Sequence, residues 1–186
     1  MNNLYLALIH HPVCNKKGEI ITSALTTIDM HDIARAAVTF GAGGFYIVTP
    51  LEDQKKLAGE VIAHWVSGVG GDLNPFRKQA LEMIRVVNSF EEVKQDIAKE
   101  HGGPVISVAT SAAQYKGSVT PGQLAEKIGE NLSHVMAFGT AWGLSEDFVN
   151  ECDLILEPIN GWNGYNHLSV RSAVSIILDR ICMNLL

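Results

Sequence analysis

Cysteine, long apolar runs and a leader segment are scarce or missing in this chain of 186 residues. The cysteines are odd in number and widely separated, so no disulfide framework is expected for Cys14, Cys152 and Cys182. No apolar run approaches the roughly 18 residues that span a bilayer. The stretch from Met1 to His10 lacks the basic start and long apolar segment of a signal peptide. We therefore expect a cytoplasmic protein that does not contact a membrane.

Positive charge is scarce as well. The chain has 14 Lys and Arg against 20 Asp and Glu, which gives a formal net charge of −6. This balance argues against a broad basic footprint for tight binding of nucleic acid, and DNA is not expected as a partner. A local basic patch, or one assembled across a dimer, is still compatible with it. Hydrophobic residues make up 47%, which is enough for residues 1–186 to form a single domain with a full core.

Sequence motifs of several enzyme classes are missing. The chain has no G-x-x-x-x-G-K-[ST] P-loop, no G-x-G-x-x-G after the first predicted strand and no G-x-S-x-G nucleophile elbow. The nearest glycine cluster, at residues 68–71, follows a predicted helix and is expected to be a loop. A nucleotide-binding oxidoreductase is therefore disfavoured. His10, His11 and Cys14 lack a second cluster with ligand spacing, so strand-end histidines are favoured over a metal site, and no metal is expected.

Short apolar runs alternate with amphipathic helical patterns along the chain. Apolar runs predict strands at residues 4–9, 45–48, 85–87, 104–109, 135–138 and 154–156. Helices are predicted at residues 29–40, 51–66, 76–84, 89–99, 120–130 and from near 167 onward. Residues 12–27 are predicted to be a long surface loop. Because most strands are continuous apolar runs separated by helices, we predict an α/β fold with a mostly parallel sheet and helices on both faces.

The predicted strand ends are the best place for a ligand. Thr110 and Ser111 follow one strand, Gly139 and Thr140 follow the next, and a glycine-containing loop begins at Glu157. In an open α/β sheet, ligands bind at the carboxyl ends of the strands. Backbone groups there could read an adenine edge, and a flat ring could lie between Leu156, Ile159 and Leu168. Taken singly, each glycine is equally an ordinary turn residue, whereas together they favour a site.

Arg35 and His31 lie one turn apart on the polar face of the helix predicted at residues 29–40. An arginine in such a place is usually only solvated. In a functional role, its fixed fork of donors would hold a phosphate or stabilise a developing oxyanion. Arginine is a poor general base, so His31 is the predicted proton acceptor.

Three stretches of the chain are similar to motifs of one known family. Residues 28–41 read IDMHDIARAAVTFG and resemble N-x-G-x-I-x-R-T-A-x-x-F-G. Residues 138–159 read FGTAWGLSEDFVNECDLILEPI and resemble a glycine-rich turn followed by G-L-S and a strand ending in I-P. Residues 166–178 read NHLSVRSAVSIIL and resemble a Leu-Asn-Val-Ser turn that opens the last helix. In this order the three resemble the SPOUT class of RNA methyltransferases, in its SpoU-like part. The chain is most similar to a small stand-alone bacterial branch that depends on S-adenosylmethionine.

The chain departs from these motifs at several positions that bear on the methyl-transfer chemistry. Asp29 stands in place of the asparagine of the first motif and His31 in place of its glycine. Residues 140–142 lack the glutamate usual in the second motif, and Ser169 stands where the third commonly has asparagine. The motifs therefore support membership of the family more strongly than its ribose 2′-O chemistry.

The resemblance implies a sheet whose C-terminal part threads into a trefoil knot, with S-adenosylmethionine bent into the knotted loops. It also implies a homodimer whose site is completed across the interface. Arg35 falls on the motif arginine and would act on the RNA from the partner subunit. The residues implied to hold the cofactor are Thr110, Ser111, Phe138, Gly139, Thr140, Gly143, Leu144, Leu156, Pro158, Ile159, Gly161, Tyr165, Asn166, Leu168, Ser169 and Ser172.

Two functions follow from this reading. The first is methyl transfer from S-adenosylmethionine to an RNA nucleotide, in tRNA or rRNA, at a ribose 2′-oxygen or a base nitrogen. Arg35 would stabilise the alkoxide or the neighbouring phosphate. The alternative is a catalytically silent S-adenosylmethionine-binding module that acts in regulation or in a larger RNA-modifying assembly. Methyl transfer is the main prediction, and the net negative charge and the missing motif glutamate are the features that count toward the alternative.

Overall fold

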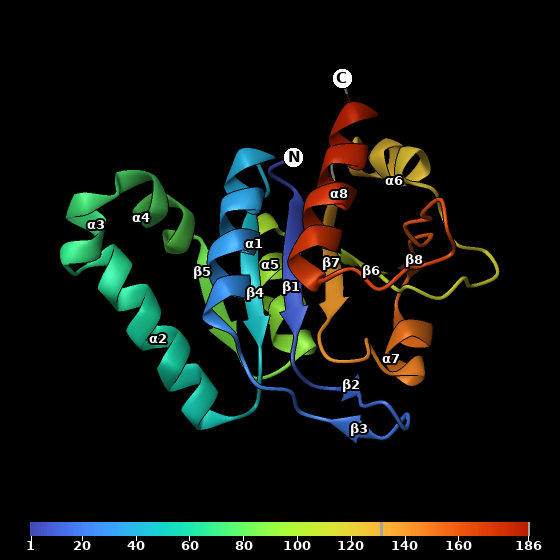
Figure 1. Cartoon of the computed structure of the whole chain (residues 1–186). Coiled ribbons are helices and arrows are strands. Elements are labelled where there is room, and N and C mark those ends of the chain that lie inside the picture. Colours follow the sequence, from blue (N-terminus) through green and yellow to red (C-terminus); the bar gives the residue numbers. More distant parts are fainter. Residues whose placement is uncertain (131, 186) are drawn as a thin grey trace.

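The computed structural model describes residues 1–130 and 132–185, and its centre is a six-stranded sheet (Figure 1). All neighbouring strands run parallel. In spatial order they are β5 (Ile84–Val87), β4 (Gly44–Val48), β1 (Leu4–Ile9), β7 (Ser133–Gly139), β6 (Val105–Ala109) and β8 (Leu154–Ile155). The predicted α/β fold with a mostly parallel sheet is confirmed.

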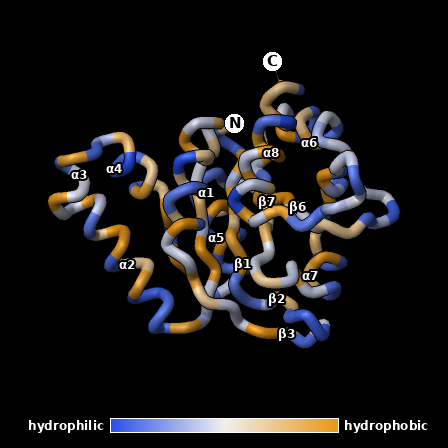
Figure 2. Tube along the Cα trace, in the orientation of Figure 1, coloured by the Kyte–Doolittle hydropathy of each residue, from blue (hydrophilic) through white to orange (hydrophobic). Residues whose placement is uncertain are grey.

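Helices cover both faces of the sheet because successive strand residues point to opposite sides. In β1, residues 4, 6 and 8 belong to one hydrophobic cluster, and residues 5, 7 and 9 belong to the other. The first cluster packs under α1 (Thr27–Thr39), α2 (Glu52–Val66), α4 (Pro75–Glu82), α6 (Pro121–Ile128) and α8 (Val170–Met183). The second packs under α5 (Phe90–His101), α7 (Glu146–Glu151) and the hairpin of β2 (Val13–Cys14) with β3 (Ile20–Ile21). Figure 2 shows the outlying helix α2 alternating between hydrophobic and hydrophilic residues, as a helix with one packed face does.

Side-chain caps decide where several helices begin. Ser89 accepts a hydrogen bond from the backbone N–H of Glu92, and Thr120 forms a capping box with Gln123. Both helix starts were predicted from the sequence. The last helix was predicted to begin near His167, which is wrong. Ser169 has an extended backbone and its hydroxyl accepts from the N–H of Ser172, so α8 begins at Val170 and residues 157–169 lie outside it.

Two segments predicted to be loops contain regular structure. Residues 12–27 include the β2–β3 hairpin, which is anchored by the fully buried Val13. Residues 68–71 contribute to a short helix, α3 (Val69–Leu73). A Cβ atom on Gly71 would come within 2.4 Å of the Trp65 carbonyl oxygen, so the glycine permits a close approach of α3 to α2. The glycines were interpreted as chain breakers, whereas one of them serves helix packing.

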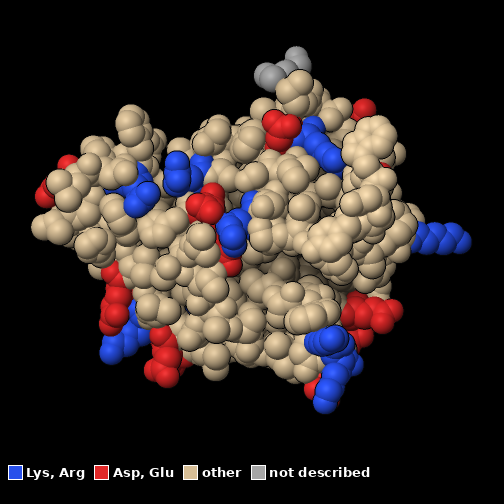
Figure 3. All heavy atoms as spheres, in the orientation of Figure 1, with Lys and Arg blue, Asp and Glu red and all other residues tan. Residues whose placement is uncertain are grey.

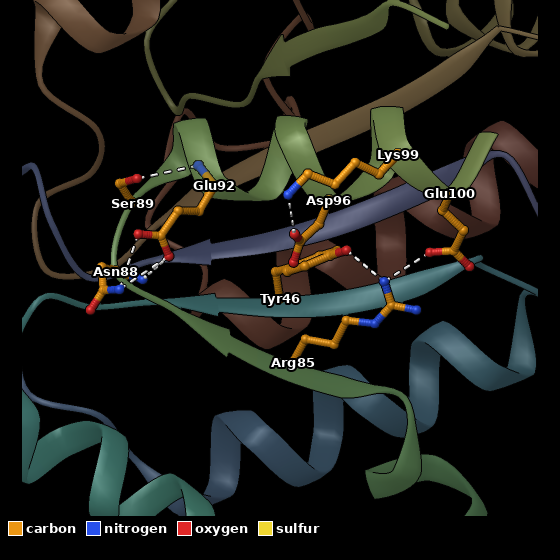
Figure 4. Close-up of polar contacts among 8 residues, drawn as sticks. All are labelled: Tyr46, Arg85, Asn88, Ser89, Glu92, Asp96, Lys99 and Glu100. Carbon is orange, nitrogen blue, oxygen red and sulfur yellow. Dashed lines mark hydrogen bonds and ion pairs between the residues drawn. The ribbon is translucent and has the colours of Figure 1, made fainter. Parts of the chain in front are cut away.

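The polar contacts of α5 hold it on the outer strands β4 and β5 (Figure 4). Arg85 on β5 donates to the Tyr46 hydroxyl at 2.8 Å and to the Glu100 carboxylate at 2.8 Å. The hydrogen bond from Arg85 lowers the pKa of Glu100, and burial raises the pKa of Tyr46. At the other end of α5, Asn88 donates to the Glu92 carboxylate at 2.9 Å through its backbone N–H. The contacts fix a helix that lies on the face opposite α1 and α8.

The continuation of β8 is held between two segments. The backbone N–H of Leu156 donates to Ala109 at 2.9 Å on one side. On the other side, Val119 donates to Ile155 at 2.8 Å and accepts from Glu157 at 2.9 Å. Residues 110–118 therefore pass from one edge of this strand to the other. The trefoil knot itself stays a prediction.

Candidate functional site

The candidate site is a cavity of about 1210 Å³ at the carboxyl ends of β6 and β7. Its walls come from the turn after β7, the loop before α8, and the first turns of α1 and α8. Parallel strands end together at this edge of the sheet, which is where open α/β proteins bind ligands. Figure 3 shows a hollow below the start of α8. Most of the surface on this face comes from residues other than Lys, Arg, Asp and Glu.

The turn after β7 has a shape that requires glycine. A Cβ on Gly139 would lie 2.4 Å from the backbone nitrogen of Leu144, and Gly143 has a φ of +102°. The hairpin supports the turn from outside, because Cys14 donates to Gly143 at 2.9 Å and accepts from Trp142 at 3.1 Å. The turn is therefore held in one backbone conformation beside the cavity.

The structure brings most of the predicted cofactor residues together. The predicted residues that line the cavity are Thr110, Ser111, Phe138, Gly139, Thr140, Gly143, Leu144, Ile159, Asn166, Leu168 and Ser169. Five others do not line it. Leu156 and Pro158 are buried, because the alternation of the strand turns Leu156 into the core. Gly161 and Tyr165 are exposed in the loop before α8, and Ser172 lines a separate depression.

Sequence reasoning missed part of the lining. Ser23, Thr26 and Asp29 enter the cavity from the segment between the hairpin and α1, and Ala173 and Ile177 enter from α8. Asp29 was noted only as a replacement for the motif asparagine. The signal that could have pointed to this wall is the cluster of serine and threonine in residues 22–27, which directly follows the hairpin and opens α1.

The charges on the cavity wall are acidic. Asp29 and Glu157 line it, and among the described lining residues there is no lysine or arginine. Asp29 is only 8% exposed, and its carboxylate accepts from Thr26 at 2.5 Å and from Arg171 at 3.1 Å. Arg171 also lies 3.5 Å from Asp32 and so joins α8 to α1 outside the cavity. A cation fits this wall better than a phosphate group does.

Arg35 and His31 lie outside the cavity. Arg35 is exposed and lines a depression of about 650 Å³ between α1 and α8, together with Arg171 and Ser172. His31 is half-buried, and its ring meets Trp65 of α2 edge-on at 5.6 Å. Burial lowers the pKa of His31, and the positive charges of Arg77 and Arg35 also lower it. The negative charge of Asp32 has the opposite effect on this pKa. The predicted catalytic pair therefore faces away from the cavity of its own chain.

Two relatives match almost the whole chain. One, named tRNA (guanine-N(1)-)-methyltransferase, is from Oleidesulfovibrio alaskensis and is 43% identical over 180 residues, which cover 96% of this chain and 42% of the relative. The other is an uncharacterized protein of Aquifex aeolicus, 39% identical over 180 residues, covering 96% of this chain and 88% of that protein. The chain thus spans about two fifths of the first relative, whose name describes a much longer protein.

Solved structures share the fold at low sequence identity. A probable methylase family protein from Haemophilus influenzae superposes with a TM-score of 0.65 at 20% identity, over 100% of this chain and 67% of that one. A second structure is the SpoU methyltransferase AviRb from Streptomyces viridochromogenes in complex with the cofactor AdoMet. It gives a TM-score of 0.54 at 17% identity, over 97% of this chain and 59% of that chain. These likenesses concern the fold.

The family follows from the sequence of the whole chain. A family model described as SAM-dependent RNA methyltransferase matches residues 3–183. The predicted family of S-adenosylmethionine-dependent RNA methyltransferases is confirmed, and the likeness to a SpoU methyltransferase concerns the fold. The chain belongs to the family of SAM-dependent RNA methyltransferases.

Proposed function

We propose that this chain transfers a methyl group from S-adenosylmethionine to a nucleotide of tRNA. The observation that carries the proposal is the character of the cavity: glycine-turn backbone and carboxylates, with no lysine or arginine among the described lining residues. A dinucleotide such as NAD would place a diphosphate in a cavity whose described lining includes Asp29 and Glu157 but no lysine or arginine. S-adenosylmethionine offers a positive sulfonium instead. The name of the longer relative supports tRNA as the substrate class.

The residues around the cavity fit an adenosyl group. Leu144, Ile159 and Leu168 line it with apolar surface on which a flat ring can pack. Backbone groups of residues 139–144 that take no part in the hydrogen bonds of the turn can bind polar edges of the ligand. When bound, S-adenosylmethionine supplies an electrophilic methyl group. The remaining task of the protein is to hold the RNA nucleophile in line with it, which is catalysis by orientation.

We propose that Arg35 acts in the site of a partner chain within a dimer. It lies on the exposed face of α1, beside α8 and outside the cavity of its own chain. If two copies pair through the α1–α8 face, Arg35 of one chain reaches the cavity of the other. There its guanidinium would bind an RNA phosphate or stabilise a developing oxyanion. His31 stays a predicted proton acceptor. Its Nδ1 is buried without a hydrogen-bond partner among the described residues, and its ring packs toward α2.

The proposal is tested in two steps. Calorimetry with S-adenosylmethionine, S-adenosylhomocysteine and NAD should show binding of both sulfur compounds and none of NAD. Tritium transfer from labelled cofactor to total tRNA, with rRNA as the second substrate, should then label tRNA. Absence of cofactor binding overturns the proposal, and labelling of rRNA alone overturns the substrate class. Cofactor binding without transfer to either RNA would instead support the silent binding module.

A further inference from the structure

A chain of hydrogen bonds lies directly behind the cavity wall. The Thr140 hydroxyl donates to the carbonyl of Ile9 at 2.9 Å, and the same oxygen lies 2.5 Å from the hydroxyl of Ser23. The Ser23 hydroxyl lies 2.9 Å from Nδ1 of His10. Ser23 and Thr140 line the cavity, whereas His10 is only 1% exposed. These hydrogen bonds thus connect a buried histidine to the surface of the cavity.

Counting protons fixes which group donates in each of these hydrogen bonds. The Ile9 carbonyl can only accept, so the proton of the Thr140 hydroxyl is used there. The Thr140 oxygen must then accept from Ser23, because Ser23 has the only remaining hydroxyl proton between them. With its proton used, the Ser23 oxygen must accept from His10. His10 therefore carries its proton on Nδ1, and its Nε2 is a bare lone pair, which agrees with the buried Nε2 having no partner among the described residues.

The consequence for the cavity is that these hydroxyls cannot donate to a ligand. The same holds for Thr110, whose hydroxyl donates to the carbonyl of Ala137 at 2.9 Å. Asp29 adds a carboxylate, which only accepts. We call Ser23, Thr110, Thr140 and Asp29 the acceptor wall. It presents oxygen lone pairs to the cavity, and Arg171 pairs with the Asp29 carboxylate from outside the cavity.

We propose that the acceptor wall selects the positively charged sulfonium of the bound cofactor, with its polarised methyl group, over the uncharged thioether left after transfer. His10 is the positioning residue that orients the Ser23 and Thr140 hydroxyls for this selection. The inference rests on the proposed function and deepens it. A preference for the charged reactant over the product also favours release of the product after each turnover.

The protonation state of His10 supports this role. Burial lowers the pKa of His10 to about 4, against the opposing effects of the Asp29 charge and of the Ser23 backbone. A neutral ring leaves the wall without a positive charge behind it at physiological pH. It also argues against His10 as a proton acceptor through this chain, because a proton arriving through Ser23 would form a buried imidazolium.

The test compares three ligands: S-adenosylmethionine, sinefungin, which carries an amine in place of the methyl-sulfonium centre, and uncharged S-adenosylhomocysteine. Calorimetry gives the ratio of the Kd of S-adenosylhomocysteine to that of each cationic ligand. In the wild type this ratio should exceed one. In Thr140→Val, which keeps the shape but removes the oxygen, it should fall by about threefold to fivefold.

His10 is tested by a matched pair of substitutions. His10→Asn keeps an N–H donor toward Ser23 and should retain the wild-type ratio, whereas His10→Phe has no donor and should lower it. If His10→Phe does not fold, two measurements still test the inference. One is the ratio in Thr140→Val, and the other is the tautomer of His10, read from the NMR shifts of its ring nitrogens. An Nε2–H tautomer, or an unchanged ratio in Thr140→Val, overturns this inference alone. Failure of the wild type to bind all three ligands overturns the proposed function as well.

Discussion

At the scale of single residues, the buried neutral ring of His10 makes stability depend on pH. The folded pKa is about 4, against 6.5 for the free side chain. Between these values the unfolded chain binds the proton that the folded chain does not, so the stabilisation is complete above pH 6.5 and is lost as pH falls toward 4. We expect the free energy of unfolding to drop by about 3 kcal/mol over this window.

The measurement is urea denaturation at a series of pH values for the wild type and His10→Asn. His31 and His134 also have pKa values lowered mainly by burial and act in the same direction. Only the difference between the two curves therefore reports His10. Parallel curves from pH 7 to 4 would show that His10 is not buried as a neutral ring.

Arg35 is the second residue whose contribution can be isolated. Arg35→Ala should lower the rate of methyl transfer by about 100-fold, the loss expected when one stabilising donor is removed. Affinity for S-adenosylmethionine should be unchanged, because Arg35 lies outside the cavity. Lys99→Ala, which removes an exposed basic residue of α5, serves as the control and should leave the rate unaltered. Equal rates in Arg35→Ala and the wild type would remove Arg35 from the mechanism.

At the scale of elements, the turn after β7 depends on Gly139. In Gly139→Ala the added Cβ would lie 2.4 Å from the nitrogen of Leu144 and 2.7 Å from the carbonyl carbon of Gly143. Because both are backbone atoms, the turn has to move, and we expect affinity for S-adenosylmethionine to fall by more than about tenfold. Gly103→Ala is the matched control in the same calorimetric titration, because no atom of residues 1–130 and 132–185 lies within 4 Å of the added Cβ.

The capping box of α6 is the second element with a measurable contribution. The Thr120 hydroxyl accepts from the N–H of Gln123 at 3.2 Å, and the Gln123 side chain accepts from the N–H of Thr120 at 2.9 Å. Thr120→Ala leaves the N–H of Gln123 without this acceptor and should destabilise the protein by about 1 kcal/mol. Thermal unfolding followed by circular dichroism measures this loss. Thr120→Ser keeps the hydroxyl and should recover most of the stability.

At the scale of the whole molecule, the question is whether one chain holds a complete site. The cavity and Arg35 open on different parts of the surface, which is why we propose a homodimer with shared sites. An equal mixture of Arg35→Ala and Gly139→Ala chains should then recover about one quarter of the wild-type activity, because random pairing gives half heterodimers with one intact site each. No recovery, in a mixture that sedimentation shows to be dimeric, would place Arg35 in the site of its own chain.

Much of the fold could be read from the chain in order. Continuous apolar runs such as the one in β1 specified buried parallel strands, and Ser89 and Thr120 fixed two helix starts, because these signals act within a few residues. Glycine was harder to interpret. Gly71 permits the contact between α3 and α2, whereas Gly139 keeps open a turn of the cavity, and both look alike as sequence.

The sequence by itself therefore determined the α/β class, the family motifs and, through the resemblance, eleven of the residues that line the cavity, since all of these depend on local pattern and chain order. Only the tertiary structure brought Ser23 and Asp29 into the cavity, turned Leu156 into the core and packed His31 against Trp65. It also joined His10 to Thr140 across neighbouring strands. These contacts link residues far apart in the chain, and they are decided by which strands lie side by side and which way each side chain points from the sheet.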